Sequence, residues 1–364
     1  MRVTYNAEYP RRVRLCAIGC GGHAQRNIFP CYPFAPVDLV AVCDLHRERA
    51  AACARLFGAR AVYTDYREML DRERPEAVVV VTNYDDNGRP RYPAIATDVL
   101  RAGAHAWIEK PPAADRAGVE AMIAASRETG KFVGVGFKKM FFPANVKAKE
   151  IISRPEFGPI STITARYPLG LPPVEARGDP RRMLGFLDHI VHPHSLLRFL
   201  GGPIESLLVE RNEQTSGAVT AIRFASGAVG SLHLCAGQSG MAPLERTEIV
   251  GRGANVVVDN NLRVTYYRPG APEGGYGRAG TFFGDDDHAP LHWEPEFSLG
   301  QLYNKGLFLL GYAPEIRAFC DCVLENRPPA VGNLDDAREM LGIYEAYCRP
   351  DGQRIRLTEA GTTA

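Results

Sequence analysis

Two groups of residues in this sequence have types and spacings suited to acid–base chemistry. Asp188 and His192 stand four residues apart, so their side chains share one face if the segment is helical. Lys110 lies in a Glu109-Lys110-Pro111 sequence that directly follows a short apolar run. Oxidation of a secondary alcohol needs a base for the hydroxyl proton and a cation beside the developing alkoxide. A carboxylate, an imidazole and an ammonium group would supply both.

A glycine-rich turn, Gly19-Cys20-Gly21-Gly22-His23-Ala24, follows the first predicted strand. It is a Gly-x-Gly-x-x-Ala fingerprint at the start of a predicted helix. The first glycine permits a tight turn, the second lets the backbone approach a pyrophosphate, and the small last residue lets helix and strand pack closely. The sequence therefore predicts a dinucleotide whose phosphates lie at the helix N-terminus.

Asp44 ends the second predicted strand, twenty residues after Ala24. A carboxylate at this place accepts hydrogen bonds from the adenosine ribose and repels a 2′-phosphate, which favours NAD over NADP. Use of NADP stays open because three basic residues follow closely: His46, Arg47 and Arg49. Asp44 could instead cap the helix predicted over residues 45–57.

The elements that must position these groups follow from the apolar pattern. Short apolar runs alternate with helix-like segments in the first third of the chain, which predicts a parallel sheet covered by helices. The predicted strands are residues 13–18, 39–43, 61–63, 77–81, 105–108 and 132–135. Open parallel sheets place their ligands at the carboxyl ends of the strands, and Lys110 follows one such end.

Beyond residue 142 the pattern changes to the alternation of half-buried strands. We predict strands at residues 161–167, a hairpin over 221–234 that turns at Ser226-Gly227, and strands at 247–250, 254–258 and 263–267. Residues 314–348 return to a helical pattern with a break at 327–329. The predicted fold is an α/β Rossmann domain, residues 1–142, followed by an α+β domain, residues 143–364, with a large, mostly antiparallel sheet and flanking helices.

Three histidines lie close together in the sequence: His189, His192 and His194. No second group of ligands with recognisable spacing accompanies them, so no metal site is predicted. Pro193 instead predicts that a helix begins beside His192.

Composition describes an ordinary globular protein of two domains. The 364 residues include 43 Lys and Arg against 42 Asp and Glu, a net charge of +1, with 45% hydrophobic residues. This balance argues against nucleic acid and anionic lipid as partners. No apolar run approaches the ~20 residues of a membrane span. The odd number of cysteines, nine, and the lack of a Cys-x-x-Cys pair predict reduced thiols and a cytoplasmic location.

Taken together, the motifs resemble the glucose-fructose oxidoreductase, inositol dehydrogenase and rhizopine-catabolism family (Gfo/Idh/MocA). The glycine fingerprint, the Glu-Lys-Pro sequence, the Asp-x-x-x-His sequence and the hairpin turn at residues 224–228 occur in the family's order and spacing, over nearly the whole chain. The resemblance implies an NAD-dependent dehydrogenase or ketoreductase that acts on a ring hydroxyl of a sugar, aminosugar or cyclitol. It also leaves two alternatives, an NAD-dependent glycosidase of the same family and a non-catalytic NAD-binding regulator.

The resemblance also assigns the site residues. The catalytic residues are Lys110, Asp188 and His192, with His192 as base, Asp188 orienting it and Lys110 contacting the substrate hydroxyl. The cofactor-binding residues are Gly19, Gly21, Gly22, His23, Ala24, Asp44, Thr82, Asn83, Glu109 and Lys110, and Glu109 is expected to position Lys110. The substrate-binding residues are Lys110, Lys138, Asp188, His192 and Ser195. The exposed face of the C-terminal sheet is expected to join two or four subunits.

The sequence departs from the family pattern at positions that bear on the substrate. Ser195 stands where the family often has Asp, Lys138 and Lys139 stand where it tends to have Asn and Arg, and Tyr92 stands where it often has His. Residues 85–90 resemble an insertion after Asn83. An acidic run, Asp285, Asp286 and Asp287, would suit an aminosugar. Lys138 and Lys139 would instead suit a negatively charged substrate such as a phosphorylated sugar.

Overall fold

The computed structural model describes residues 3–269, 289–295 and 305–357, which form two compact units interleaved along the chain. The first unit comprises Met1–Phe141, Asp179–Val191 and Asn304–Glu345. The second comprises Phe142–Gly178, His192–Tyr303 and Ala346–Ala364. The continuous division after residue 142 stays a prediction.

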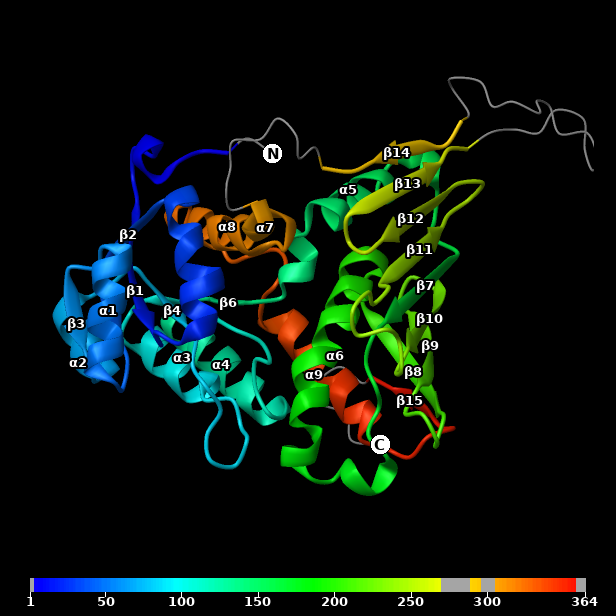
Figure 1. Ribbon diagram of the computed structural model, residues 1–364, viewed down its shortest axis with the longest axis horizontal. Helices are drawn as coiled ribbons and strands as arrows, with labels where there is room; N and C mark the ends of the chain where they lie inside the picture. Colours follow the sequence, from blue (N-terminus) through cyan, green and yellow to red (C-terminus); the bar gives the residue numbers. More distant parts are fainter. Residues whose placement is uncertain (1–2, 270–288, 296–304, 358–364) are drawn as a thin grey trace, which may run out of the picture. The chain divides into compact units, whose positions relative to one another are not determined.

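The first unit is built on a parallel sheet with the strand order β3-β2-β1-β4-β5-β6 (Figure 1). Its strands are β1 Val13–Ile18, β2 Val37–Cys43, β3 Ala61–Tyr63, β4 Ala77–Val80, β5 His105–Ile108 and β6 Val133–Val135. All neighbouring strands in this sheet pair in parallel. The predicted doubly wound α/β architecture is confirmed, because side chains buried on both faces of a parallel sheet leave continuous apolar runs in the sequence.

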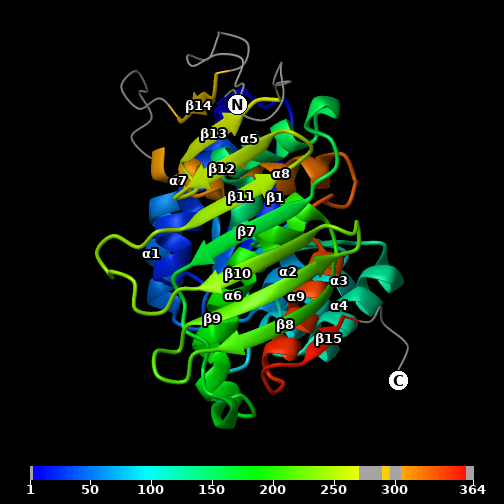
Figure 2. The same ribbon diagram turned by 90° about the vertical axis from the view of Figure 1, so that its right-hand side faces the viewer.

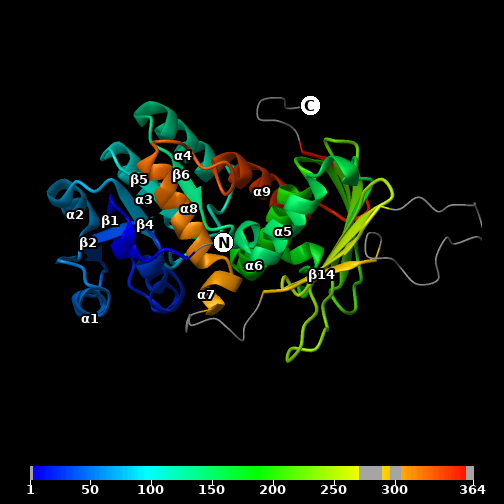
Figure 3. The same cartoon turned by 90° about the horizontal axis from the view of Figure 1, so that it is seen from above.

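Helices connect and cover these strands. They are η1 Asn6–Glu8, η2 Ala24–Ile28, η3 Phe29–Phe34, α1 Arg47–Phe57, α2 Tyr66–Glu73, α3 Tyr92–Arg101, α4 Arg116–Thr129, η4 Lys138–Phe141, α7 Lys305–Leu309, α8 Tyr312–Leu324 and α9 Leu334–Tyr347. The helix predicted after the glycine fingerprint is present, but it is a π-helix. The Phe29 amide donates to the Ala24 carbonyl five residues earlier. In Figure 3, α8 and the pair α3 and α4 lie on opposite faces of the sheet.

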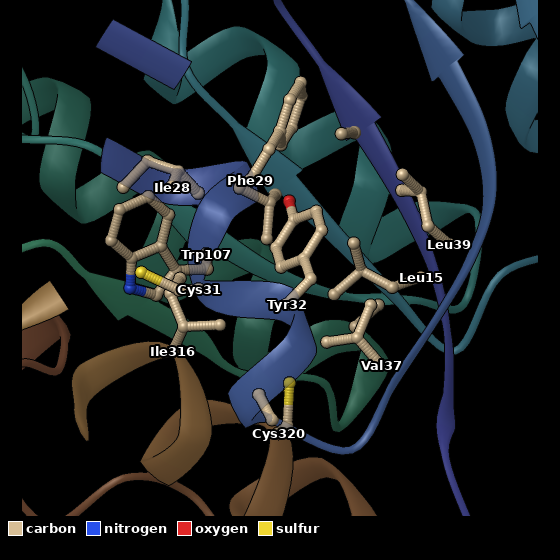
Figure 4. Close-up of a cluster of buried hydrophobic side chains, with 14 of the residues drawn as sticks. Leu15, Ile28, Phe29, Cys31, Tyr32, Val37, Leu39, Trp107, Ile316 and Cys320 are labelled. Carbon is tan, nitrogen blue, oxygen red and sulfur yellow. The ribbon is translucent and has the colours of Figure 1, made fainter. Parts of the chain in front are cut away.

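The core of the first unit joins segments far apart in the sequence. Figure 4 shows Phe29 and Tyr32 of the η2–η3 segment beside Leu15 of β1, with Ile316 and Cys320 of α8 in the same cluster. All five side chains are at most 5% exposed. A helix from the C-terminal third therefore completes the core under the first strand.

The second unit carries a sheet of nine strands within the described residues, in the order β14-β13-β12-β11-β7-β10-β9-β8-β15 (Figure 2). They are β7 Thr162–Tyr167, β8 Ile204–Arg211, β9 Ala218–Phe224, β10 Val229–Leu234, β11 Arg246–Val250, β12 Asn255–Asp259, β13 Arg263–Tyr267, β14 Leu291–Trp293 and β15 Arg354–Arg356. Neighbouring strands pair antiparallel, except that β7 and β10 are parallel. The predicted hairpin is the β9–β10 pair, whereas β8, β14 and β15 were not predicted. Helix α5, Pro143–Ile152, packs on β12 and β13, and short turns η5 Pro155–Phe157 and η6 Val174–Ala176 complete the connections.

The long helix α6, Pro180–Gly201, corrects one prediction. Pro193 lies inside this helix, so the expectation that a helix begins beside His192 was wrong. Proline inside a helix removes one backbone hydrogen bond and costs about 3 kcal/mol. The flanking residues Val191, Leu196 and Leu197 are almost fully buried, and their burial offsets that cost. The predicted one-turn spacing of Asp188 and His192 on one helix is confirmed.

The tight turn at Gly19 constrains everything that follows β1. Its φ is +96°, and a Cβ placed on it would lie 1.9 Å from the carbonyl oxygen of Val81. Only glycine fits, because both the backbone conformation and the contact exclude a side chain.

We predict that Gly19→Ala lowers the free energy of unfolding by about 3 kcal/mol or more, from left-handed strain plus the clash. Gly58→Ala is the matched control: φ there is +80°, but its Cβ would meet no atom within 4 Å, so only about 1 kcal/mol should be lost. Urea denaturation of both variants checks this. Equal losses would contradict the clash argument.

Candidate active site

Several predicted site residues gather at the carboxyl edge of the parallel sheet in the first unit. Gly19 follows β1, Asp44 follows β2, Thr82 lies just past β4, and Glu109 and Lys110 follow β5 directly. Because the strands are parallel, these ends meet at one edge. The strand order places β2, β1, β4 and β5 side by side there.

A cavity of about 710 Å³ opens beside this edge, a volume typical of ligand sites. Its lining includes Gly19 and Gly21 of the glycine turn, Asp44, and Thr82 and Asn83. A Cβ on Gly21 would meet no atom within 4 Å, so the backbone at this glycine stands open to an approaching group. The hydroxyl of Thr82 is buried and has no hydrogen-bond partner among the described residues. Open backbone and an unsatisfied hydroxyl fit a dinucleotide with its phosphates on the glycine turn.

Asp44 both shapes this cavity and holds the glycine turn. Its Oδ2 accepts a hydrogen bond from the Cys20 amide at 2.9 Å, and its Oδ1 accepts one from the His46 amide at 2.9 Å. The Arg49 guanidinium lies 3.4 Å from Oδ1. Helix α1 has His46 at its N-cap and no side-chain capping bond, so the alternative that Asp44 caps this helix was wrong. The bond to the His46 amide closes the turn before the helix instead. The same carboxylate lines the cavity, where a ribose hydroxyl could use its remaining lone pairs.

Glu109 is buried between the glycine turn and Lys110. One carboxylate oxygen lies 2.9 Å from Nε2 of His23, and the other accepts the Lys110 amide at 3.1 Å. Only 5% of Glu109 is exposed. The Lys110–Pro111 peptide bond is cis. Glu109 thus fixes the backbone from which the Lys110 side chain leaves.

The Lys110 ammonium donates to Oδ1 of Asp188 at 2.9 Å, across 78 residues of sequence. The two side chains are 15% and 27% exposed. The phenol of Tyr84 donates to the same oxygen at 2.7 Å. Burial, and after it the bond to the carboxylate, raise the pKa of Tyr84, so the phenol keeps its proton and acts as a donor. One carboxylate oxygen therefore receives a cation and a neutral donor together.

His192 lies one turn beyond Asp188 on α6 and is 6% exposed. Its backbone carbonyl accepts the hydroxyl of Ser195 at 3.1 Å. Ser195 is fully buried, and its hydroxyl is used in this bond to the helix backbone. The assignment of Ser195 to the substrate stays a prediction.

Lys138 follows β6 at the same sheet edge. Its ammonium donates to the phenol oxygen of Tyr312 at 2.8 Å and lies 4.5 Å from the centre of that ring. Burial lowers the pKa of Lys138, and the charge of Glu109 offsets part of this effect. The neighbouring Lys139 is buried, at 4% exposed. The assignment of Lys138 to the substrate also stays a prediction.

Within the described residues, no group of three or more His, Cys, Asp or Glu side chains is arranged to hold a metal ion. His194 is fully buried, and its Nε2 lies 2.9 Å from the hydroxyl of Tyr347.

The acidic run at Asp285, Asp286 and Asp287 lies outside the described residues. Over the same part of the chain, no helix has the length and apolar character needed to cross a membrane.

Two residues that contact the site were not predicted from the sequence. Tyr84 reaches Asp188 across 104 residues, and Tyr312 reaches Lys138 across 174. A signal for Tyr84 existed, since it lies two residues past Thr82 at the ligand edge of the sheet. Nothing in the sequence linked Tyr312 to that edge.

Comparison with known proteins gives two family models that match this chain. The model described as "Oxidoreductase family, NAD-binding Rossmann fold" matches residues 13–137, and the GFO/IDH/MocA C-terminal domain matches residues 145–257. Scyllo-inositol 2-dehydrogenase (NAD(+)) of Bacillus subtilis is 26% identical over 95% of this chain and 96% of its own. Myo-inositol 2-dehydrogenase of Thermotoga maritima is 24% identical over 85% and 87%. The crystal structure of GenD2 from gentamicin A biosynthesis, in complex with NAD, has a TM-score of 0.70 and 23% identity over 99% of both chains.

The buried His194 generates a prediction about stability in acid. Burial lowers its pKa from 6.5 to about 3. Between these values the unfolded chain binds a proton that the folded chain does not, so stability falls as the pH falls through this window. His194→Gln should reduce the slope of unfolding free energy against pH by about 1.4 kcal/mol per unit between pH 6 and 4. Urea denaturation at several pH values measures this, with His233→Gln, at a half-exposed position, as control. An unchanged slope in His194→Gln would contradict it.

Proposed function

Because this chain belongs to the Gfo/Idh/MocA family of NAD-binding oxidoreductases and acts on CH–OH groups, we propose that it transfers a hydride between NAD and a ring secondary alcohol or ketone. We propose a sugar, an aminosugar or a cyclitol as the substrate. The observation that carries the proposal is the ion pair between Lys110 and Asp188 at the ligand edge of the sheet. The names of the two inositol dehydrogenases support the substrate class.

Each proposed catalytic residue has one task in this scheme. NAD, when bound, supplies the hydride acceptor. His192 takes the proton from the substrate hydroxyl, and Asp188, one turn earlier on the same helix, favours the imidazolium that forms. The Lys110 ammonium stabilises the developing alkoxide. In the ketone-reducing direction the His192 imidazolium returns the proton that it took. Glu109, by binding the Lys110 amide, orients that lysine.

The cofactor site supports NAD, with NADP disfavoured. The Asp44 carboxylate lines the cavity and would repel a 2′-phosphate. Arg49 lies against that carboxylate, at 3.4 Å, and so partly neutralises it. We propose Gly19, Gly21, Gly22, His23, Ala24, Asp44, Thr82, Asn83, Glu109 and Lys110 as the residues that contact or support NAD.

The direct test is reduction of NAD by the purified protein with a panel of inositols, sugars and aminosugars, followed by absorbance. Lys110→Ala should lower kcat about 10³-fold, the range for loss of one group that stabilises a developing oxyanion. Lys147→Ala removes a different lysine–carboxylate pair, with Glu150 at 2.9 Å, and should leave kcat unchanged.

Two other outcomes would overturn the proposal. If the wild type forms no reduced cofactor from any alcohol but cleaves glycosides in the presence of NAD, the protein is a glycosidase of the same family. If it binds NAD and does neither, it is a regulator.

We propose that the exposed face of the second unit's sheet joins copies of this chain into a homodimer or homotetramer. Val219 and Val229 point to one face of the β9–β10 pair, and each is 43% exposed. A second copy would remove these apolar side chains from water. Val229→Glu should lower the mass measured by light scattering to that of one chain, whereas Val146→Glu, on α5, should not. An unchanged mass in Val229→Glu would contradict this interface.

We also propose that the protein works in the cytoplasm. All nine cysteines are free, and seven of them are buried. Unpaired thiols in this number suit a reducing compartment.

A further inference from the structure

We infer that Tyr84 is a positioning residue for the proposed reaction: its phenol holds the Asp188 carboxylate in the orientation that pairs with Lys110. The inference rests on the proposed function for its catalytic meaning. Its geometric basis is one shared atom, since Oδ1 of Asp188 accepts from the Tyr84 hydroxyl at 2.7 Å and from Lys110 Nζ at 2.9 Å.

The segment that carries Tyr84 is itself fastened to α6. The guanidinium of Arg181 donates to the carbonyl oxygen of Asp86 at 2.8 Å. Gly88 also lies against this residue, since a Cβ placed on Gly88 would be 3.6 Å from the side chain of Arg181. Tyr84 and Pro90 form an isolated antiparallel bridge that closes the segment at its base. These contacts hold residues 84–90 against the first turns of α6, so the phenol meets Asp188 from a fixed direction.

The turn inside this segment is also internally bonded. The side chain of Asp85 accepts the backbone amides of Asn87 and Arg89 at 2.9 and 2.8 Å. The guanidinium of Arg91 donates to the carbonyl oxygen of Tyr84 at 3.3 Å. A segment built in this way costs little further entropy when it orders Asp188.

Two donors on one oxygen restrict the carboxylate in a way that one donor cannot. Lys110 alone is a compact charge on a flexible stem, and either oxygen of Asp188 would satisfy it. The second donor, at a fixed place, selects Oδ1 and stops rotation of the carboxylate. Oδ2 is thereby left to face other groups, and His189 Nε2 lies 3.9 Å from it.

The position of Tyr84 also ties this pair to the cofactor. Tyr84 lines the same cavity as Gly21, Asp44 and Thr82. Its ring therefore stands between the dinucleotide site and the ion pair. Phenylalanine at this position keeps the ring, which lines the cavity, and removes only the hydroxyl, which holds Asp188. Tyr84→Phe therefore removes the contact with Asp188 and leaves the cavity lining in place.

The test is a double-mutant cycle with Tyr84→Phe and Asp188→Ala, measured by kcat, by KM for NAD and by the thermal unfolding temperature. Tyr84→Phe should lower kcat about tenfold in the wild type, with KM for NAD changed less than twofold, because a hydrogen bond to a charged acceptor is lost and the ring stays. In the Asp188→Ala background, which has no acceptor for the phenol, the same change should alter kcat less than twofold.

Tyr63→Phe is the matched control. Its phenol also donates to a carboxylate, Oε1 of Glu73, at 2.6 Å, in the first unit but away from Lys110. It should leave kcat unchanged. Additive effects of Tyr84→Phe and Asp188→Ala on kcat, or a change in KM for NAD as large as that in kcat, would overturn the inference.

The unfolding measurement separates failure of this inference from failure of the proposed function. If the wild type oxidises no alcohol, the proposed function fails, and the cycle in unfolding temperature still decides whether Tyr84 holds Asp188. A loss of about 2 °C from Tyr84→Phe that disappears in Asp188→Ala supports the contact. Equal losses in both backgrounds overturn it.

Discussion

The half-buried ion pair between Lys110 and Asp188 is the interaction on which the rest of the site depends. Charged groups shielded from water must be paired, and each of these two finds its partner on a segment 78 residues away. Lys110 can reach Asp188 only because β5 ends at the sheet edge and because the first turns of α6 belong to the same compact unit. This contact therefore joins the turn after β5 to the first turns of the helix.

Two further constraints align the cofactor site with this pair. Gly19 permits the close passage of the chain beside Val81, and Asp44 anchors the glycine turn through the Cys20 amide. Glu109 then connects that turn to Lys110, since it meets His23 on one side and the Lys110 amide on the other. The glycine turn after β1 and Lys110 after β5 are thus held by two strands that flank β4 in one sheet, which limits their relative motion.

The sequence was sufficient for the features that depend on local pattern. Continuous apolar runs predicted the parallel strands, alternation predicted the β9–β10 hairpin, and the one-turn spacing of Asp188 and His192 was correct because α6 runs through both. Pro193 misled the prediction of where that helix begins, since burial of its neighbours outweighs the lost backbone bond. Features that depend on distant partners were missed. The contact of Tyr84 with Asp188, and the packing of α8 beside β1, arise from the tertiary fold alone.

Direct passage of a ring C–H hydrogen to NAD can be followed by isotope transfer. The polyol that is oxidised fastest would be supplied with deuterium on every ring carbon, and the reduced cofactor would be analysed by mass spectrometry and NMR. Direct transfer places one deuterium on each reduced nicotinamide, with none lost to solvent. Reduced nicotinamide that contains hydrogen from solvent, or the absence of reduced nicotinamide with every polyol, would contradict it.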